Sequence, residues 1–342
     1  MLSESQGLIA RGHDVRLICP PEARIHAEAP RWGVPVVALP IGRKRPAGVK
    51  ALYGWLKASR CDVVSTHSST DTWLAALALL ALGRPVPLVR TRHISAPVHR
   101  NRPTRWLYTR ATARIVTTGE ALREELIRTN GFPPARIDSV PTGVDSKRYR
   151  PGDRMIARAA LGLPRDEKLV GIVATLRDWK GHEYLIEALG GLPPDASLVI
   201  VGDGPRRPIL ESFVATLGLQ ARVRFAGDQA DVVPWLQALD AFALPSFANE
   251  GVPQALIQAM LAGLPCVTTH VGSIAELARD GETALVVPPK DAAALRAALQ
   301  RLLADEALGK RLGQGARRHA EANFSYERML DAMERIYAQV RR

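Results

Sequence analysis

The sequence predicts an α/β protein with two Rossmann-like, doubly wound domains that face each other across a cleft. Its 342 residues suggest two domains rather than one. Short apolar, β-branched runs alternate with helical patterns along the chain, which is typical of parallel sheets covered by helices. Pro141–Asp153 is rich in Pro, Gly and charge, so it is expected to link two such blocks.

Each block contains six expected strands. Those of the first block are Asp14–Cys19, Val34–Leu39, Asp62–Thr66, Val86–Thr91, Arg114–Thr118 and Arg136–Val140. Those of the second block are Leu169–Ala174, Ser197–Val201, Val223–Ala226, Ala241–Leu244, Pro265–Thr269 and Ala284–Val287. Helical patterns lie between them, and Ala292–Leu303 and Tyr326–Val340 follow. We therefore expect domains at residues 1–145 and 146–342, and the last helix could pack back onto the first domain.

The start of the chain departs from this pattern. Leu2–Arg11 has a short helical pattern closed by Gly12, whereas every later unit begins with a strand. The first domain is therefore expected to lack a central strand and the Gly-rich turn after it. Such a loss exposes the backbone of two neighbouring strands. This form should be less stable and less active than one extended upstream by a strand and a turn.

Charge is distributed unevenly. Residues 1–150 carry 24 Lys and Arg against 11 Asp and Glu, whereas residues 151–342 carry 22 against 23. The basic first half suggests an anionic partner, either a membrane surface, a phosphorylated substrate or nucleic acid, although a solvated Arg-rich surface is the simpler alternative. His99–Arg110 interleaves cations with aromatic residues, which suits a phosphorylated glycolipid. No recognised nucleic-acid module surrounds it, so we expect no nucleic-acid partner.

The compartment is inferred from the cysteines and the apolar runs. Cys19, Cys61 and Cys266 lie far apart in apolar runs and suggest reduced core residues. Met1–Gly7 has no signal-peptide pattern, and the longest apolar run, Trp73–Leu82, is too short to span a bilayer. We expect a cytoplasmic protein that can associate with the inner face of the cytoplasmic membrane.

Two loops after expected strands have features of phosphate sites. Ala174–Gly181 carries Arg177 and Lys180, and a strand-end loop with two cations suits a diphosphate. Surface cations are common, so this pattern alone is weak. The turn after the next strand contains Gly202 and Gly204, whose missing side chains let backbone approach a ligand. An ordinary tight turn is the alternative reading.

The most informative segment is Leu244–Val267, in which a strand, a loop, a helix and a strand follow one another. Pro253 fits the first turn of the helix and Gly263 fits its end. The loop presents Glu250 and the amides of Gly251 and Val252 at the helix N-terminus, where they can bind substrate. An acid there could simply complement the helix dipole.

Four motifs, in their order and spacing, make residues 7 to 342 resemble the family 4 glycosyltransferases with the GT-B fold. They are Gly143–Asp145, Lys180–Gly181, Gly202–Pro205 and the segment from Glu250 to Pro265. The resemblance implies transfer of a sugar from a nucleotide diphosphate donor with retention of configuration. It implies no metal and no cofactor. The first strand and Gly-rich loop of the family have no counterpart here.

The resemblance also implies roles for single residues. Lys180 would neutralise the donor diphosphate, and Glu250 would hydrogen-bond the hydroxyls of the donor sugar. The second acid of the family pair, which binds the ribose, is here Gln258, whose carboxamide can still bond a diol. The Arg of the strand-end loop is displaced, because Thr175 stands in its place and Arg177 follows two residues later.

His93 matches the active-site His of the family, which approaches donor sugar and acceptor. His67, at the end of another expected strand, is a second candidate, and either could be a structural hydrogen-bonding residue. No D-x-D carboxylate pair follows an apolar strand, so the charge of the departing diphosphate would be met by cations and amides.

The basic first half points to a lipid-linked or lipopolysaccharide acceptor and to glycan synthesis for the cell envelope. The expected partners are a nucleotide sugar, an acceptor glycan or glycolipid and an anionic membrane surface. A nucleotide-sugar epimerase of the same architecture is an alternative. An inactive donor-binding subunit is another.

Overall fold

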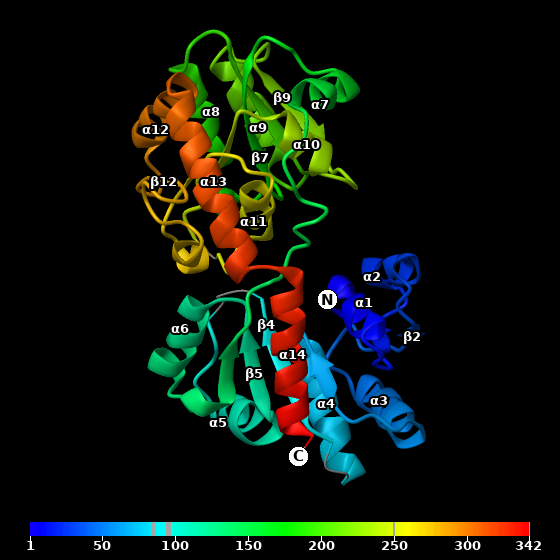
Figure 1. Ribbon diagram of the computed structural model, residues 1–342. Coiled ribbons are helices and arrows are strands. Elements are labelled where there is room, and N and C mark those ends of the chain that lie inside the picture. The colour runs from blue at the N-terminus through cyan, green and yellow to red at the C-terminus, as the bar shows by residue number, and fades with distance from the viewer. Residues whose placement is uncertain (84–85, 94–96, 249, 342) are drawn as a thin grey trace. The chain divides into compact units, whose positions relative to one another are not determined.

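The computed structural model describes residues 1–83, 86–93, 97–248 and 250–341, which divide into two compact units (Figure 1). Unit 1 comprises Met1–Pro141 and Glu327–Arg342, and unit 2 comprises Thr142–Tyr326. Both contain parallel sheets packed against helices, so the predicted α/β class is confirmed. The division falls after Pro141, slightly before the expected boundary, and the last helix belongs to unit 1.

Unit 2 contains one six-stranded parallel sheet with the order β12-β11-β10-β7-β8-β9. Its strands are β7 (Lys168–Val173), β8 (Ala196–Val201), β9 (Val223–Gly227), β10 (Ala241–Leu244), β11 (Cys266–Thr268) and β12 (Leu285–Val286). The first strand of the unit, β7, lies between β8 and β10. The strand order reverses there, so the carboxyl ends of β7 and β10 lie where such sheets bind ligands.

Helices pack against this sheet and bury its strands. They are α7 (Arg154–Leu161), α8 (His182–Gly190), α9 (Arg207–Thr216), α10 (Val233–Ala238), α11 (Gln254–Leu261), α12 (Ala292–Ala304) and α13 (Glu306–Asn323). Two short 3₁₀ turns, η4 (Asp178–Lys180) and η5 (Gly272–Glu276), follow β7 and β11. All four residues of β10 are buried, as expected for a parallel strand between two helical layers.

Unit 1 contains two separate parallel sheets. The smaller sheet pairs β1 (Leu17–Cys19) with β2 (Val36–Ala38). The larger has the order β3-β4-β5-β6 and consists of β3 (Val64–Thr66), β4 (Leu88–Arg92), β5 (Arg114–Thr117) and β6 (Ile137–Ser139). No ladder joins β1 to β3 among the described residues, so the sheet of unit 1 is interrupted between them.

The helices of unit 1 include the chain's first and last ones. They are α1 (Leu2–Ala10), α2 (Arg24–Glu28), α3 (Pro46–Ala58), α4 (Ser69–Leu82), α5 (Arg102–Trp106), α6 (Glu120–Asn130) and α14 (Tyr326–Val340). Short turns are η1 (Ala29–Trp32), the π-helical η2 (Leu107–Ala111) and η3 (Pro134–Arg136). At the end of α1, Arg11 forms ion pairs with Glu327, Asp331 and Glu334 at 2.8, 2.7 and 2.5 Å. These contacts fasten α14 to α1.

Each of the twelve expected strands has an observed counterpart at nearly the same position, and the expected helix Tyr326–Val340 is α14. The helix α13 was not predicted. Across the described ranges, no helix combines the length and the apolar composition that spanning a bilayer requires.

Candidate donor and catalytic residues

Lys180 lies in unit 2, in the loop between β7 and α8. The loop forms the turn η4 and ends at Gly181, which has a left-handed φ of 73°. A Cβ at Gly181 would collide with the carbonyl oxygen of Pro245, which follows β10. Glycine therefore lets the loops after β7 and β10 approach each other closely. This approach holds Lys180 at the carboxyl edge of the two central strands.

The Gly-rich turn after β8 packs against the same loop. The Leu176 N–H donates to the Asp203 carbonyl oxygen at 3.0 Å. Gly202 has a φ of 132°, and a Cβ there would collide with the carbonyl oxygen of Ala174, while Gly204 lies against Leu176. The predicted Gly202 and Gly204 therefore let the turn after β8 pack closely against the loop after β7, and their contact with a ligand stays a prediction.

Glu250 forms an ion pair with Lys180. The Lys180 Nζ lies 2.7 Å from the Glu250 Oε1, and the Ser246 Oγ donates to the same oxygen at 2.6 Å. The two ionic side chains are 19% and 5% exposed, so the pair is largely withdrawn from water. Within the described ranges no donor to Oε2 is found, which leaves that oxygen able to accept from a ligand hydroxyl.

Backbone contacts fix the loop that carries Glu250. The Phe247 N–H donates to the Trp179 carbonyl oxygen at 2.8 Å, which ties this loop to η4. The Ser273 N–H donates to the Glu250 carbonyl oxygen at 3.3 Å, which ties it to η5. Glu250 is therefore held by three strand-end loops. Asn249 of the predicted motif lies outside the described residues.

Helix α11 follows this loop, as the sequence predicts. Pro253 is its N-cap residue, and Gly263, with a φ of 77°, follows its end. Val252 is buried and Gly251 is partly exposed immediately before the helix. Gln258 lies on α11 and is 7% exposed. Its contact with a ribose stays a prediction.

Arg177 occupies the start of η4 and is exposed. Its guanidinium carbon lies 5.9 Å from the centre of the Trp179 ring. The neighbouring Asp178 pairs with Arg206, at 2.7 Å. Arg177 can therefore turn toward an anion at this loop without breaking an ion pair that the described residues form.

Three further residues adjoin this site and were not predicted to take part. Ser246 lies inside the motif that contains Glu250, and His182 directly follows Gly181, so both had a local signal. Lys290 had none: its Nζ lies 4.5 Å from the centre of the Phe247 ring. Lys290 has a φ of 63°, a conformation that is uncommon outside glycine and often occurs at functional sites.

In unit 1, His93 and His67 lie together at the carboxyl ends of the neighbouring strands β4 and β3. The His67 Nδ1 is 3.1 Å from the His93 Nε2, and the two rings stack with centres 5.4 Å apart. The His67 N–H donates to the Asp71 Oδ2 at 3.0 Å, and Ser68 and Asp71 form a capping box at the start of α4. The structure therefore pairs the predicted His93 with the second candidate.

The surroundings of both histidines disfavour the charged imidazolium form. Desolvation lowers the pKa of His67 to about 3, assisted by the charges of His93 and the amino terminus. Desolvation and the charge of the amino terminus also lower the pKa of His93, whereas the charge of Asp71 raises it. A neutral imidazole has one donor and one acceptor nitrogen. The pair can therefore share one proton and present a further ring nitrogen to a substrate.

The residues of unit 2 are suited to an anionic leaving group. Positive charge at this sheet edge comes from Lys180 and Arg177, and the backbone near Gly202 lies at the same edge. Fixed charges there can stabilise the negative charge that develops on a departing diphosphate. Glu250 supplies an acceptor for hydroxyl groups. In the part of the chain that the structure describes, no group of three or more His, Cys, Asp or Glu side chains could hold a metal ion.

Comparison with known proteins identifies the class. Residues 1–148 match the family model described as Glycosyltransferase Family 4, and residues 153–319 match the model described as Glycosyl transferases group 1. The two matches together span most of the chain. The chain therefore has the two-domain GT-B fold of the glycosyltransferases. Within this class it belongs to the family 4 type.

Individual relatives agree with this membership. The chain is 34% identical over 295 residues to the D-inositol 3-phosphate glycosyltransferase of Mycobacterium tuberculosis, covering 83% of this chain and 58% of that protein. A glycosyltransferase from Rickettsia africae has a similar fold, with a TM-score of 0.89, 19% identity and coverage of 99% and 93%. Anabaena HepE in complex with UDP-glucose has a TM-score of 0.87, 22% identity and coverage of 99% and 94%.

His182 should make the stability of unit 2 depend on pH. It is 2% exposed, and burial, followed by the charge of Lys180, lowers its pKa from 6.5 to about 4. Below pH 6.5 the unfolded chain binds this proton more readily. The free energy of unfolding should therefore fall from pH 6.5 toward pH 4, by about 3 kcal/mol in total from this residue.

Hydrogen exchange of the β7 and β8 amides across this pH range measures the effect in unit 2 alone. The His182→Leu variant removes the titrating group while keeping an apolar side chain of similar size, so its profile should be flatter than that of the unchanged protein. Equal pH dependence in the two proteins would contradict the burial argument.

Proposed function

We propose that the protein transfers a sugar from a nucleotide diphosphate donor, bound in unit 2, to an acceptor glycan or glycolipid, with retention of configuration and without a metal. The observation that carries the proposal is the Lys180–Glu250 pair beside Ser246 at the carboxyl edge of β7 and β10. Lys180 would bind the diphosphate and Glu250 the sugar hydroxyls. Gly202 and Gly204 would allow the nucleotide to approach, and Gln258 would bind its ribose.

The acceptor is proposed to carry an anionic group. Residues 1–150 hold the whole basic excess of the chain, and a field of one sign attracts ligands of the other. The name of the mycobacterial relative includes a phosphorylated polyol. A lipid-linked or lipopolysaccharide glycan at the cell envelope has the same anionic chemistry. We propose that His93, which is hydrogen-bonded to His67, contacts the reacting groups of donor and acceptor.

A transfer assay tests this proposal. The protein is incubated with UDP-, GDP- or ADP-sugars labelled in the sugar, together with phosphorylated polyols or lipid-linked glycans. We expect acceptor-dependent release of the nucleoside diphosphate and a labelled product with the anomeric configuration of the donor. Isomerised donor without any acceptor would indicate an epimerase, and binding without transfer would indicate a donor-binding subunit.

Transfer is expected to survive chelation. Fixed cations near the diphosphate, Lys180 and Arg177, would meet the charge of the leaving group. The measurement is the initial rate after treatment with EDTA, and after addition of Mg²⁺ or Mn²⁺. Loss of the rate with EDTA, followed by recovery with either ion, would overturn the metal-free assignment.

Gln258→Glu is expected to keep or improve nucleotide binding. A carboxylate accepts hydrogen bonds from both hydroxyls of a ribose, whereas a carboxamide offers one acceptor oxygen. Calorimetric titration of the variant with a nucleoside diphosphate measures the dissociation constant, and Gln314→Glu, at an exposed position of α13, is the matched control. A weaker constant for Gln258→Glu alone, with folding unchanged, would remove Gln258 from the ribose site.

A further inference from the structure

Three aromatic side chains of unit 2 gather beside the Lys180–Glu250 pair. Trp179 directly precedes Lys180 in η4, and the Phe247 N–H donates to the Trp179 carbonyl oxygen at 2.8 Å. The Tyr184 ring, in α8, meets the Phe247 ring edge-on, with centres 6.1 Å apart and an interplanar angle of 88°. All three side chains are partly exposed. We call Trp179, Tyr184 and Phe247 the aromatic cluster.

Lys290 reaches this cluster from the edge of the sheet. It follows β12, the edge strand, whereas Lys180 and Glu250 follow the central strands β7 and β10. The Lys290 Nζ lies 4.5 Å from the centre of the Phe247 ring, and the lysine is exposed. The cluster is therefore approached by one cation from the side of β12 and by the donor residues from the middle of the sheet.

The backbone holds Lys290 in an unfavourable conformation. Its φ of 63° is left-handed, and no other residue except glycine has a positive φ in the described ranges. Pro288 and Pro289 restrict the backbone before it. After it, Asp291 caps α12 by accepting from the Ala294 N–H at 2.8 Å. An exposed cation–π contact contributes no more than such strain costs, so the contact with the ring alone does not explain a lysine where glycine would fit.

The charge of Lys290 is available to a ligand. In the part of the chain that the structure describes, no carboxylate pairs with it, and Asp291 is engaged by the helix cap. Two other acids near the cluster, Asp178 and Glu183, both pair with Arg206, at 2.7 and 3.3 Å. An ammonium group has three N–H donors, and a ring engages only one side of it. The remaining donors can therefore bind an anion.

Aromatic rings beside a cation match the chemistry of an anionic sugar. A pyranose has an apolar face of C–H groups, which packs on aromatic side chains while the hydroxyl groups stay hydrated. A carboxylate or phosphate on the same sugar accepts hydrogen bonds from an ammonium group. A neutral sugar would gain nothing from the lysine or from its strained backbone. The aromatic cluster with Lys290 therefore matches a sugar unit that carries a negative charge.

We propose that the aromatic cluster and Lys290 form an acceptor subsite of unit 2 that binds an anionic sugar unit. The inference rests on the proposed function, in which the donor occupies Lys180 and Glu250. The subsite is assigned to the acceptor because Lys290 follows the edge strand, whereas the donor residues follow the central strands. The sugar unit would pack on Phe247 and Trp179, and its carboxylate or phosphate would bind the Lys290 Nζ.

Three substitutions of Lys290 separate its charge from its backbone strain. Lys290→Met removes the charge and keeps the strain, Lys290→Gly removes both, and Lys290→Arg keeps both. Each variant is titrated, without any nucleotide, with a tetrasaccharide of galacturonic acid or with neutral maltotetraose, and the indole N–H resonance of Trp179 is followed by NMR. Lys310→Met, at an exposed position of α13, is the matched control.

We expect the acidic tetrasaccharide to shift the Trp179 resonance and maltotetraose to have little effect. Lys290→Met and Lys290→Gly should each weaken binding by about tenfold or more, while Lys290→Arg and Lys310→Met retain it. Lys290→Gly should also melt at a higher temperature than Lys290→Met, because glycine relieves the left-handed strain. Loss of binding in a variant that is more stable cannot result from a damaged fold.

No binding of the acidic tetrasaccharide, equal binding of both tetrasaccharides, or acidic binding that Lys290→Met retains would overturn the proposal. So would an effect of Lys290→Met on nucleotide sugars alone, which would place the lysine in the donor site. Titration with a nucleoside diphosphate tests the proposed function separately. Lys180→Ala should weaken nucleotide binding and leave saccharide binding unchanged, whereas Lys290→Met should do the reverse.

Discussion

Replacement of Lys180 by alanine is expected to lower kcat by on the order of 10²-fold or more, because fixed charges that meet a developing anion contribute effects of this size. The Lys180 Nζ lies at the carboxyl edge of β7, 2.7 Å from the Glu250 Oε1. A diphosphate at this edge would replace or share that contact. Single-turnover and steady-state rates on the variant separate the chemical step from binding.

Lys168→Ala is the matched control for this variant. Lys168 begins the same strand, is exposed and lies at the opposite end of β7 from the loop that carries Lys180. Its removal should leave the rate unchanged. Near-normal turnover of Lys180→Ala, with an unchanged circular dichroism spectrum and melting temperature, would mean that the diphosphate binds elsewhere.

Gly181→Ala is expected to have the largest effect on stability. Gly181 has a φ of 73°, and its added Cβ would collide with the carbonyl oxygen of Pro245. Gly218 has a similar φ of 67°, but a Cβ there meets nothing within 4 Å. Gly218→Ala should therefore cost only the left-handed strain of about 1–2 kcal/mol. Gly181→Ala should cost that strain and, in addition, separate the loops after β7 and β10.

Denaturant unfolding of the two variants, followed by hydrogen exchange in unit 2, measures the difference. We expect Gly181→Ala to lose several kcal/mol more than Gly218→Ala, an exceptional value for one methyl group. It should also lose donor binding. Equal destabilisation by the two substitutions would show that the loop after β10 moves without cost and does not hold Lys180 in place.

The strands of both units could be predicted because each is a short apolar run between turn signals, and β10 was predicted to the residue. The helix α13 could not, because it carries Gly309, Gly313 and Gly315, which weaken a helix in isolation. In the structure Gly313 lies directly against the backbone of Gly263, so close packing with the segment after α11 explains its small side chain.

The placement of the candidate site residues in the fold could be predicted in part. Lys180, Glu250, Gly202 and Gly204 each follow a strand, so their common edge could be inferred from the order of elements. The ion pair of Glu250 with Lys180 could not be predicted, because 70 residues separate the two in sequence and only the pairing of β7 with β10 brings them together. The stacking of His67 on His93 required the pairing of β3 with β4 in the same way.

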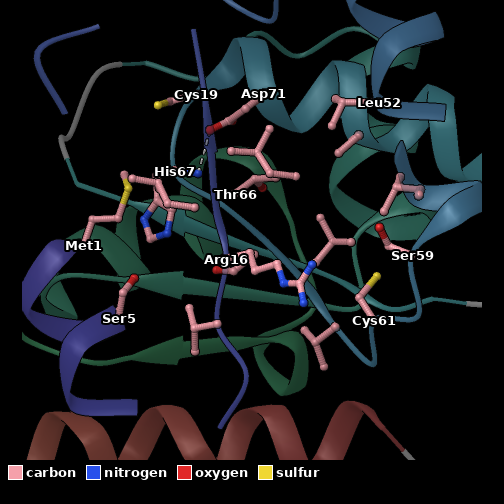
Figure 2. Close-up of a pocket in the computed structure, with 18 of the residues that line it drawn as sticks. Met1, Ser5, Arg16, Cys19, Leu52, Ser59, Cys61, Thr66, His67 and Asp71 are labelled. Atoms are coloured by element: carbon pink, nitrogen blue, oxygen red, sulfur yellow. Dashed lines mark hydrogen bonds between the residues drawn. The ribbon is translucent and has the colours of Figure 1, made fainter. Parts of the chain in front are cut away.

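The interrupted sheet of unit 1 is a feature on which the sequence prediction and the structure agree. The sequence predicted an incomplete first sheet, and among the described residues no ladder joins β1 to β3, with a pocket along the division (Figure 2). Neither the size of the pocket nor the set of residues that line it could be predicted from the sequence. Both depend on how the β1-β2 sheet packs relative to the β3-β4-β5-β6 sheet.

Calorimetric titration of the protein with UDP, GDP and ADP tests the central claim, that unit 2 binds a nucleotide diphosphate at Lys180 and Glu250, most directly. The account predicts that one of these diphosphates binds with a stoichiometry near one and that the matching monophosphate binds more weakly. It predicts that Lys180→Ala weakens binding by about tenfold or more, while Lys168→Ala has no effect. Absence of binding by all three diphosphates, or binding that Lys180→Ala leaves unchanged, would contradict it.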